Sequence, residues 1–129
     1  MSELRLKRLT FSSEADNWLR VLKSRTSVTP NLLCRIGFCC SLEEKGVPDP
    51  SKYPEDSDRE INRYTLLGEL EPVLVALLRQ RLNRDGVPPS QMDDQFRAHM
   101  NRGVILLAGR LKGLDDLHTL MTEAARGVA

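Results

Sequence analysis

The chain has 129 residues, of which 40% are hydrophobic and 29% are charged, with one Trp, two Tyr and three Phe. This length and balance predict one globular domain over residues 1–129 and exclude a disordered chain. No apolar run reaches the ~18 residues that a bilayer crossing requires, so we expect no membrane association. The net charge of +1 hides an asymmetry, because residues 1–40 hold seven Lys or Arg against three acids (+4), whereas residues 46–75 hold three against seven (−4). We therefore expect a basic end and an acidic flank.

The chain starts MSELRLKRL, which lacks the apolar centre of a secretory signal. Three cysteines, two of them adjacent, are a poor basis for a disulfide framework and suit a reducing compartment. We expect a cytoplasmic protein with free thiols.

The first predicted element is a brief strand in residues 4–10, LRLKRLT, which is short and rich in Leu and basic residues. A helix follows, with Ser12 and Ser13 as candidate N-caps and acidic residues near the positive end of its dipole. Apolar residues then recur at i, i+3, i+4 and i+7, the spacing of one buried stripe: Ala15, Trp18, Leu19 and Leu22. This helix is expected to end between Lys23 and Ser27.

A second helix is predicted from Thr29 and Pro30 to about Glu44, since Thr can cap a helix and Pro fits its first turn. The helix is apolar almost all round, with Arg35 the only charge in its middle. Such a helix is buried on most sides, either by its own chain or by another subunit.

The second half of the chain begins with a proline-rich acidic loop, residues 46–58. A helical stripe follows before the stop at Asp85 and Gly86, made of Leu70, Val73, Leu74, Leu77, Leu78 and Leu82. Another runs from Gln91 to Lys112, made of Phe96, Met100, Val104, Leu107 and Leu111, and a shorter last helix holds Leu114, Leu117, Leu120 and Met121. The fold class expected is therefore mainly α, a helical domain of four to five helices with a short N-terminal strand.

Cys34, Cys39 and Cys40 all lie on the second predicted helix. At ~100° per residue the three thiols point in different directions and cannot converge on one metal ion. We interpret them chiefly as packing residues. The alternative is a redox or sulfur-carrying thiol, for which Cys34 is the candidate because it lies nearest the N-terminus of the helix, where a thiolate would be stabilised.

Other catalytic patterns are weak. His99 and His118 lack metal-binding spacing, and the sequence contains no Gly-rich phosphate loop and no G-x-S-x-G. We expect no cofactor and no metal site. An acidic stretch, Glu55, Asp56, Asp58 and Glu60, offers oxygen ligands for Mg²⁺ and leaves a metal-dependent nuclease open as an alternative, although such stretches are usually solvated.

The turn between the first two helices carries the stronger signal. Arg20, Lys23 and Arg25 complement the C-terminal dipole of the first helix, and they also precede a helix N-terminus, where free N–H groups attract phosphate. We predict a phosphate-contact surface made of these residues, the second helix and the basic strand: Arg20, Lys23, Arg25, Arg5, Lys7, Arg8, Thr29, Asn31 and Arg35.

Four glycines fall within the helical patterns, namely Gly37, Gly103, Gly109 and Gly113. Each costs roughly 1 kcal/mol relative to Ala in a helix, so we expect them to allow close helix contact. Together with the nearly all-apolar second helix, they favour self-association.

Two stretches, SRTSVTPNLLCRIGFCCSLEEKGVPDP and EINRYTLLGELEPVLVALLRQR, resemble the DndE family of DNA sulfur modification proteins. The resemblance is clear over about residues 4–85. It implies a mainly helical protein that self-associates, as a tetramer in some members, and binds double-stranded DNA with a preference for nicked duplex. It also implies work beside the other subunits of the DNA phosphorothioation complex. The order of strand, helix and helix is similar to that of ribbon-helix-helix repressors.

The resemblance places the family's basic surface on Arg20, Lys23 and Arg25. This chain has Ser24 and Ser27 where family members often carry glycine, which argues against a positive φ in the turn. We therefore expect a non-enzymatic DNA-binding subunit. The alternative is a nicking endonuclease or sulfur-handling component of the same system, for which no catalytic residue is assigned.

Overall fold

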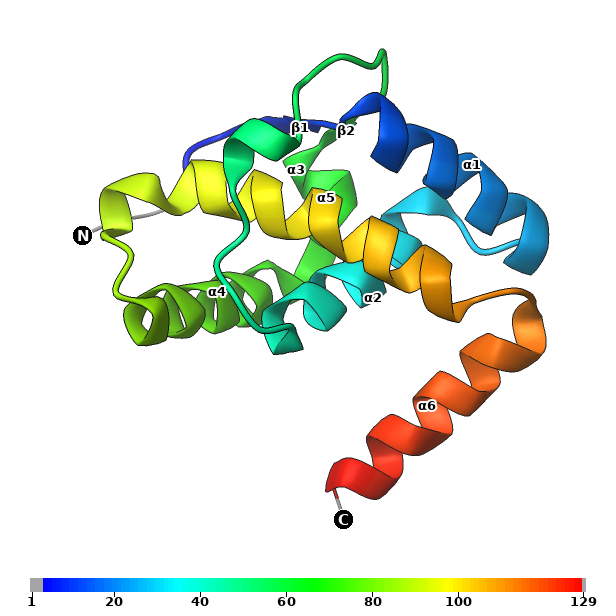
Figure 1. The fold of residues 1–129 in the computed structure, drawn as a ribbon. Coiled ribbons are helices and arrows are strands. Elements are labelled where there is room, and N and C mark those ends of the chain that lie inside the picture. Colours follow the sequence, from blue (N-terminus) through cyan, green and yellow to red (C-terminus); the bar gives the residue numbers. More distant parts are fainter. Residues whose placement is uncertain (1–3, 129) are drawn as a thin grey trace.

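The computed structural model describes the backbone of residues 4–128 (Figure 1). The long helices are α1 (Ser13–Thr26), α2 (Pro30–Glu43), α4 (Glu71–Asp85), α5 (Met92–Arg110) and α6 (Leu114–Val128). Short elements complete the order: strands β1 (Arg8–Thr10) and β2 (Glu60–Asn62), helix α3 (Arg63–Leu67), and the 3-10 turns η1 (Pro50–Lys52), η2 (Gly68–Leu70) and η3 (Pro89–Gln91). The predicted mainly α fold with an N-terminal strand is confirmed.

The start of α1 follows the expected capping chemistry. Ser12 adopts an extended conformation, and its hydroxyl accepts a hydrogen bond from the backbone N–H of Ala15 at 3.1 Å. The predicted apolar stripe is confirmed, because Ala15, Leu19 and Leu22 are buried and Trp18 is half-buried against the same core. One face of α1 therefore belongs to the core and the other faces solvent.

Helices α2 and α5 cross at the centre of the molecule (Figure 1). Their backbones meet at two glycines: a Cβ on Gly103 would lie 2.1 Å from the carbonyl oxygen of Gly37. The predicted close helix contact is confirmed for Gly37 and Gly103. It is wrong for Gly109 and Gly113, around which a Cβ would meet nothing within 4 Å, and Gly113 lies in the turn before α6 rather than inside a helix.

The N-terminal strand has a partner within its own chain. β1 pairs antiparallel with β2, with Leu9 opposite Ile61. β2 was not predicted, because three residues between an acidic loop and a helix carry too little alternation to stand out. In ribbon-helix-helix proteins the strand pairs with a second chain, so the similarity is limited to the order of elements.

A short helix that the sequence analysis did not separate, α3, precedes the helix that ends at Asp85. Gly68, at φ 55°, separates α3 from η2 and α4. A side chain at Gly68 would also collide with the guanidinium of Arg35, whose NH2 would be 2.8 Å from the new Cβ. The chain turns here, so the Leu70–Leu82 stripe is only partly buried.

Within that stripe, Leu74, Leu78 and Leu82 are buried, whereas Leu70, Val73 and Leu77 are 45%, 55% and 40% exposed. The predicted stripe is therefore divided between the core and the surface. In α5, by contrast, the whole predicted stripe is buried. Among the described residues, no helix is both long and apolar enough to span a membrane.

Candidate nucleic-acid interface

The turn from α1 to α2 is a sharp corner. Ser27 ends α1 in a left-handed conformation at φ 60°, and its N–H donates to the carbonyl of Lys23 at 2.8 Å. The argument from serine against a positive φ is therefore wrong for Ser27. The Thr26 hydroxyl stabilises the corner from inside, since it donates to the Leu22 carbonyl and accepts from the Val28 N–H. This hydroxyl is consequently occupied within the fold.

The three basic residues of α1 do not share one face. Arg20 and Lys23 lie one turn apart on the exposed side, where Arg20 pairs with Asp16 at 3.2 Å while its side chain stays 68% exposed. Arg25 turns inward: its guanidinium lies 6.0 Å from the ring of Trp18 and donates to the Leu111 carbonyl at 3.1 Å. Arg20 and Lys23 are thus open to a ligand, whereas Arg25 ties α1 to the end of α5.

The polar residues that begin α2 hold the helix to α3. Thr29 makes no capping hydrogen bond with its side chain, so that prediction is wrong; its hydroxyl donates to the Asn31 Oδ1 at 2.6 Å. Asn31 in turn donates to the Thr65 carbonyl. Arg35 donates to the carbonyls of Leu66 and Thr65 at 2.7 and 3.2 Å. These contacts satisfy the open end of α3 and give Arg35 a structural role.

The basic residues near β1 form a separate group. Arg8 pairs with Glu60 across the two strands at 3.3 Å, and Arg5 and Lys7 are exposed. They lie before the start of α1, whereas the corner follows its end, and a helix of 14 residues is about 21 Å long. The sequence predicted one surface, and the structure separates it into two basic groups.

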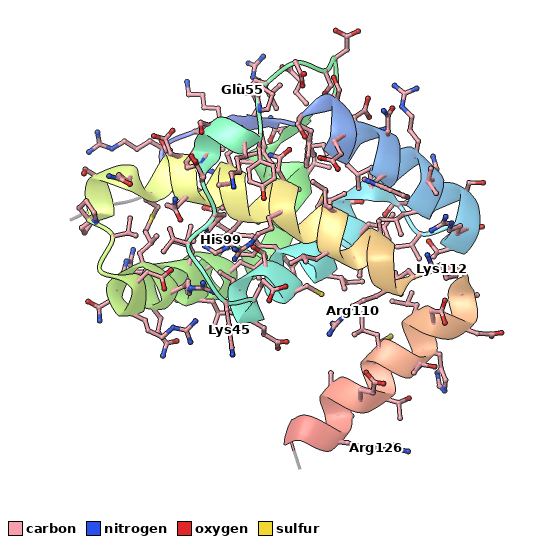
Figure 2. The ribbon with its side chains drawn as sticks, viewed as in Figure 1. Lys45, Glu55, His99, Arg110, Lys112 and Arg126 are labelled. Atoms are coloured by element: carbon pink, nitrogen blue, oxygen red, sulfur yellow. The ribbon has the colours of Figure 1, made fainter. Side chains whose placement is uncertain are left out.

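Two cations that the sequence analysis did not single out, Arg110 and Lys112, lie at the end of α5. Lys112 lies in the link between α5 and α6. The hydrogen bond from Arg25 to the neighbouring Leu111 carbonyl holds this link beside the end of α1 (Figure 2). Arg110, two residues before Lys112, donates a long hydrogen bond to the Cys40 Sγ at 3.9 Å. The only signal in the sequence was a basic helix end, GRLKG, which is common at helix C-termini.

The acidic segment, residues 46–58, contacts the start of α1, at the other end of this helix from the corner. The carboxylate of Asp56 accepts the Ser13 N–H at 2.7 Å, and Arg59 pairs with Asp16. Burial raises the pKa of Asp16, but hydrogen bonds and charges from Arg59 and Arg20 outweigh it and hold the pKa below its ordinary value. Charge is therefore graded along α1, acidic at its start and basic at its end, and Glu55 lies across the molecule from Lys112 (Figure 2).

The three thiols are free and poorly suited to nucleophilic chemistry. Cys34 is fully buried, and burial raises its pKa to about 12. The hypothesis of a thiolate at Cys34 is therefore wrong, and its role in packing is confirmed. Burial also raises the pKa of Cys39 and Cys40, although Cys39 is exposed. Within residues 4–126, no three His, Cys, Asp or Glu side chains are grouped to hold a metal ion.

The geometry defines a small helical protein with a two-stranded ribbon and an exposed basic corner. The family model described as DNA sulphur modification protein DndE matches residues 8–114, and the chain belongs to this family. The family works in DNA phosphorothioate modification.

Solved structures agree on the fold. DndE from Escherichia coli B7A, involved in DNA phosphorothioation modification, has a TM-score of 0.67 and 22% identity, covering 81% of this chain and 99% of that chain. A lysine-substituted mutant of a DndE involved in DNA phosphorothioation has a TM-score of 0.62 and 23% identity over the same shares. A search of curated proteins found no match.

Proposed function

We propose that this protein is the DNA-binding subunit of a phosphorothioate modification complex and that it binds duplex DNA through phosphates, with a preference for nicked DNA. The observation that carries the proposal is the family match over residues 8–114. The names of the solved relatives, both tied to DNA phosphorothioation, support it.

The contacts are made by the basic corner, which we define as Arg20, Lys23 and Lys112 together with the N-terminus of α2. Arg20 and Lys23 offer charge on one exposed stripe, and the first turn of α2 offers backbone N–H groups. Contacts of this kind position a protein on the duplex without reading base sequence. Arg25 contributes indirectly, by holding the corner to α5.

A nick favours binding because it lowers the cost of bending the duplex. Bending a continuous duplex of 20–30 base pairs by 40–90° costs on the order of 1–6 kcal/mol. A break in one strand removes part of that stiffness, so more phosphates contact the basic corner at a lower bending free energy. Self-association into a homo-oligomer, which we expect to be a tetramer, would repeat the corner on one particle, and the remaining subunits of the modification complex are the expected protein partners.

The test is a fluorescence-anisotropy titration of the full chain against labelled duplexes that share one sequence and differ only by a central nick. EDTA is present throughout, so that metal-dependent cleavage does not create nicks during the measurement. We expect the nicked duplex to bind at least threefold more tightly, and scrambling the sequence to leave both affinities unchanged. Equal affinity for the two duplexes would remove the preference for nicks, and absence of binding at 50 mM salt would overturn DNA binding itself.

A further inference from the structure

Two buried side-chain atoms on α5 make no hydrogen bond to any other described residue: the Oε1 of Gln95 and the Nε2 of His99. Gln95 is 2% exposed and His99 is 0% exposed. The two residues are four positions apart on one helix, so their side chains leave the same face of α5 one turn apart. A buried polar atom without a partner is costly, and two on one face point to a shared ligand.

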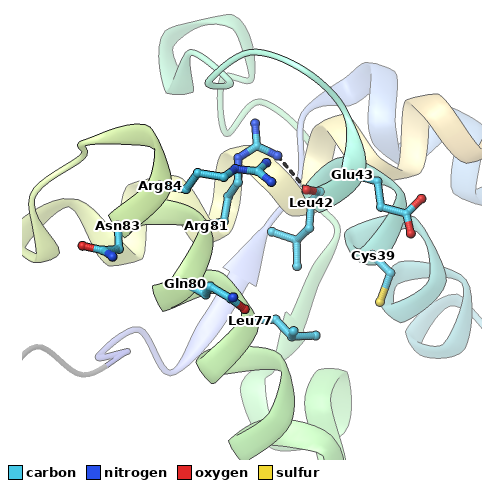
Figure 3. A pocket seen from close by; sticks show the side chains of 8 residues that line it. All are labelled: Cys39, Leu42, Glu43, Leu77, Gln80, Arg81, Asn83 and Arg84. Carbon is cyan, nitrogen blue, oxygen red and sulfur yellow. Dashed lines mark hydrogen bonds between the residues drawn. The ribbon is translucent and has the colours of Figure 1, made fainter. Parts of the chain in front are cut away.

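The segment that follows α2 covers this face of α5. Arg81 of α4 donates to the Leu42 carbonyl at 2.7 Å (Figure 3) and to the Gly46 carbonyl at 2.6 Å. Further along the same segment, the Nε2 of Gln95 donates to the Pro48 carbonyl at 3.0 Å. These hydrogen bonds hold the segment against α4 and α5 and keep the two atoms away from bulk water.

The hydrogen bonds already made by Gln95 and His99 define what the ligand must do. The amide nitrogen of Gln95 is bound to Pro48, so its Oε1 faces the site and can only accept. The Nδ1 of His99 shares a hydrogen bond with the Ser41 hydroxyl at 2.8 Å, and its Nε2 donates or accepts according to the tautomer. The ligand must therefore donate to Oε1 and be able to bond Nε2 in either direction.

The surrounding charges exclude an ion. An anion has no proton to donate to the Gln95 Oε1. A cation would lie beside Arg102 and Arg81, whose positive charges, after burial itself, lower the pKa of His99. The ligand is therefore small and neutral, with both a donor and an acceptor.

Water has this chemistry and the required size. Side chains one turn apart on a helix have Cβ atoms roughly 5–6 Å apart. A water molecule that makes two hydrogen bonds of about 2.8 Å reaches atoms up to about 5.6 Å apart. Buried waters in proteins typically bond to polar groups that the fold leaves unsatisfied.

We propose that one internal water molecule is bound between Gln95 and His99, where it donates to Oε1 and shares a second hydrogen bond with Nε2. The water completes a chain of hydrogen bonds from Ser41 through His99 and Gln95 to Pro48. It thereby connects the end of α2 to the segment that follows, through the face of α5. The site is separate from the basic corner and does not depend on DNA binding.

The first test needs no variant. A crystal structure of the full chain should show one ordered water within hydrogen-bonding distance of both the Gln95 Oε1 and the His99 Nε2. A direct hydrogen bond between these two atoms would overturn the proposal, and so would a well-ordered site without a water between them.

The second test counts long-lived internal waters in solution by oxygen-17 magnetic relaxation dispersion. Gln95→Met and His99→Phe each remove one partner, so each should lower the count by one. The double variant should also lower it by one, because both side chains hold the same molecule. Gln91→Met, on the exposed turn η3, is the matched control and should keep the native count.

Either of two results in solution would contradict the shared site. An unchanged count in a single variant with native circular dichroism would show that its side chain holds no water. A double variant that loses two waters would show two separate sites. If a variant does not fold, the crystal structure of the native chain still decides the proposal.

Discussion

His99 is the buried titratable side chain at the centre of the α2–α5 contact. Its Nδ1 lies 2.8 Å from the Ser41 hydroxyl, which also accepts a hydrogen bond from Arg102. Burial and, after it, the positive charges of Arg102 and Arg81 lower the pKa of His99 to about 3. The ring is therefore neutral and shares a hydrogen bond with the Ser41 hydroxyl at Nδ1, and protonation would place a third positive charge beside two arginines.

This arrangement predicts a loss of stability in acid. An ordinary His has a pKa near 6.5, so the unfolded chain takes up a proton that the folded chain refuses until about pH 3. The contribution of His99 to the free energy of unfolding is fully present above pH 6.5. It falls by up to about 1.4 kcal/mol per pH unit between pH 6.5 and about pH 3. Urea titrations at several pH values should show a shallower acid branch for His99→Phe than for the native chain.

The matched control makes the same exchange at an exposed position. His118→Phe, on α6, should give an acid branch parallel to that of the native protein. An unchanged slope in a folded His99→Phe variant would contradict the assignment of the acid sensitivity to His99.

At the scale of elements, the closest helix contact depends on two missing side chains. At Gly37 a Cβ would lie 2.8 Å from the backbone carbon of Gly103, and backbone cannot move aside as a flexible side chain can. Beside this contact, the ring centroids of Phe38 on α2 and Phe96 on α5 lie 5.4 Å apart. The two glycines thus set how tightly the central helix pair packs.

We expect Gly103→Ala to destabilise the fold by about 3 kcal/mol or to prevent folding, because the added methyl group overpacks the contact. Gly109→Ala is the control on the same helix, where a Cβ meets nothing within 4 Å and the gain in helix propensity is up to about 1 kcal/mol. Denaturant unfolding compares the two variants. Equal stabilities would show that α5 moves away from α2 at little cost.

At the scale of the whole molecule, a nearly neutral chain places its charges at different ends. The acidic segment binds the start of α1 through Asp56, and the basic corner follows its end. Such an arrangement directs a polyanion to one side, which the net charge of +1 would not indicate. The effect is strongest at low ionic strength.

The arrangement predicts position-dependent effects on DNA binding. Lys23→Gln should reduce affinity for every duplex alike and lower the slope of log K against log salt concentration by about one unit per lost contact. Lys52→Gln removes the same charge from exposed η1, within the acidic segment, and should leave that slope nearly unchanged. Identical slopes for the two variants would contradict the placement of the contacts.

The sequence by itself determined the long helices and much of the core. Caps, proline positions and apolar spacing are local properties of the sequence. They are sufficient to predict α1, α2, α5 and the buried stripe of α5. The motifs also pointed to the family. Helical spacing excluded a metal ion shared by the three cysteines, and the tendency of free Cys to be buried favoured packing over chemistry.

Only the tertiary structure decided which faces stay exposed and which cations stay available. From the sequence, Arg25 and Arg35 are candidates for phosphate contacts. In the structure their guanidinium groups donate instead to the carbonyls of Leu111 and Leu66, which are distant in sequence. The exposed half of the α4 stripe and the Gly37–Gly103 contact likewise depend on how helices cross. The spacing of apolar residues along the sequence indicates the type of secondary structure. Burial and hydrogen-bond pairing depend on neighbouring elements that the local sequence does not specify.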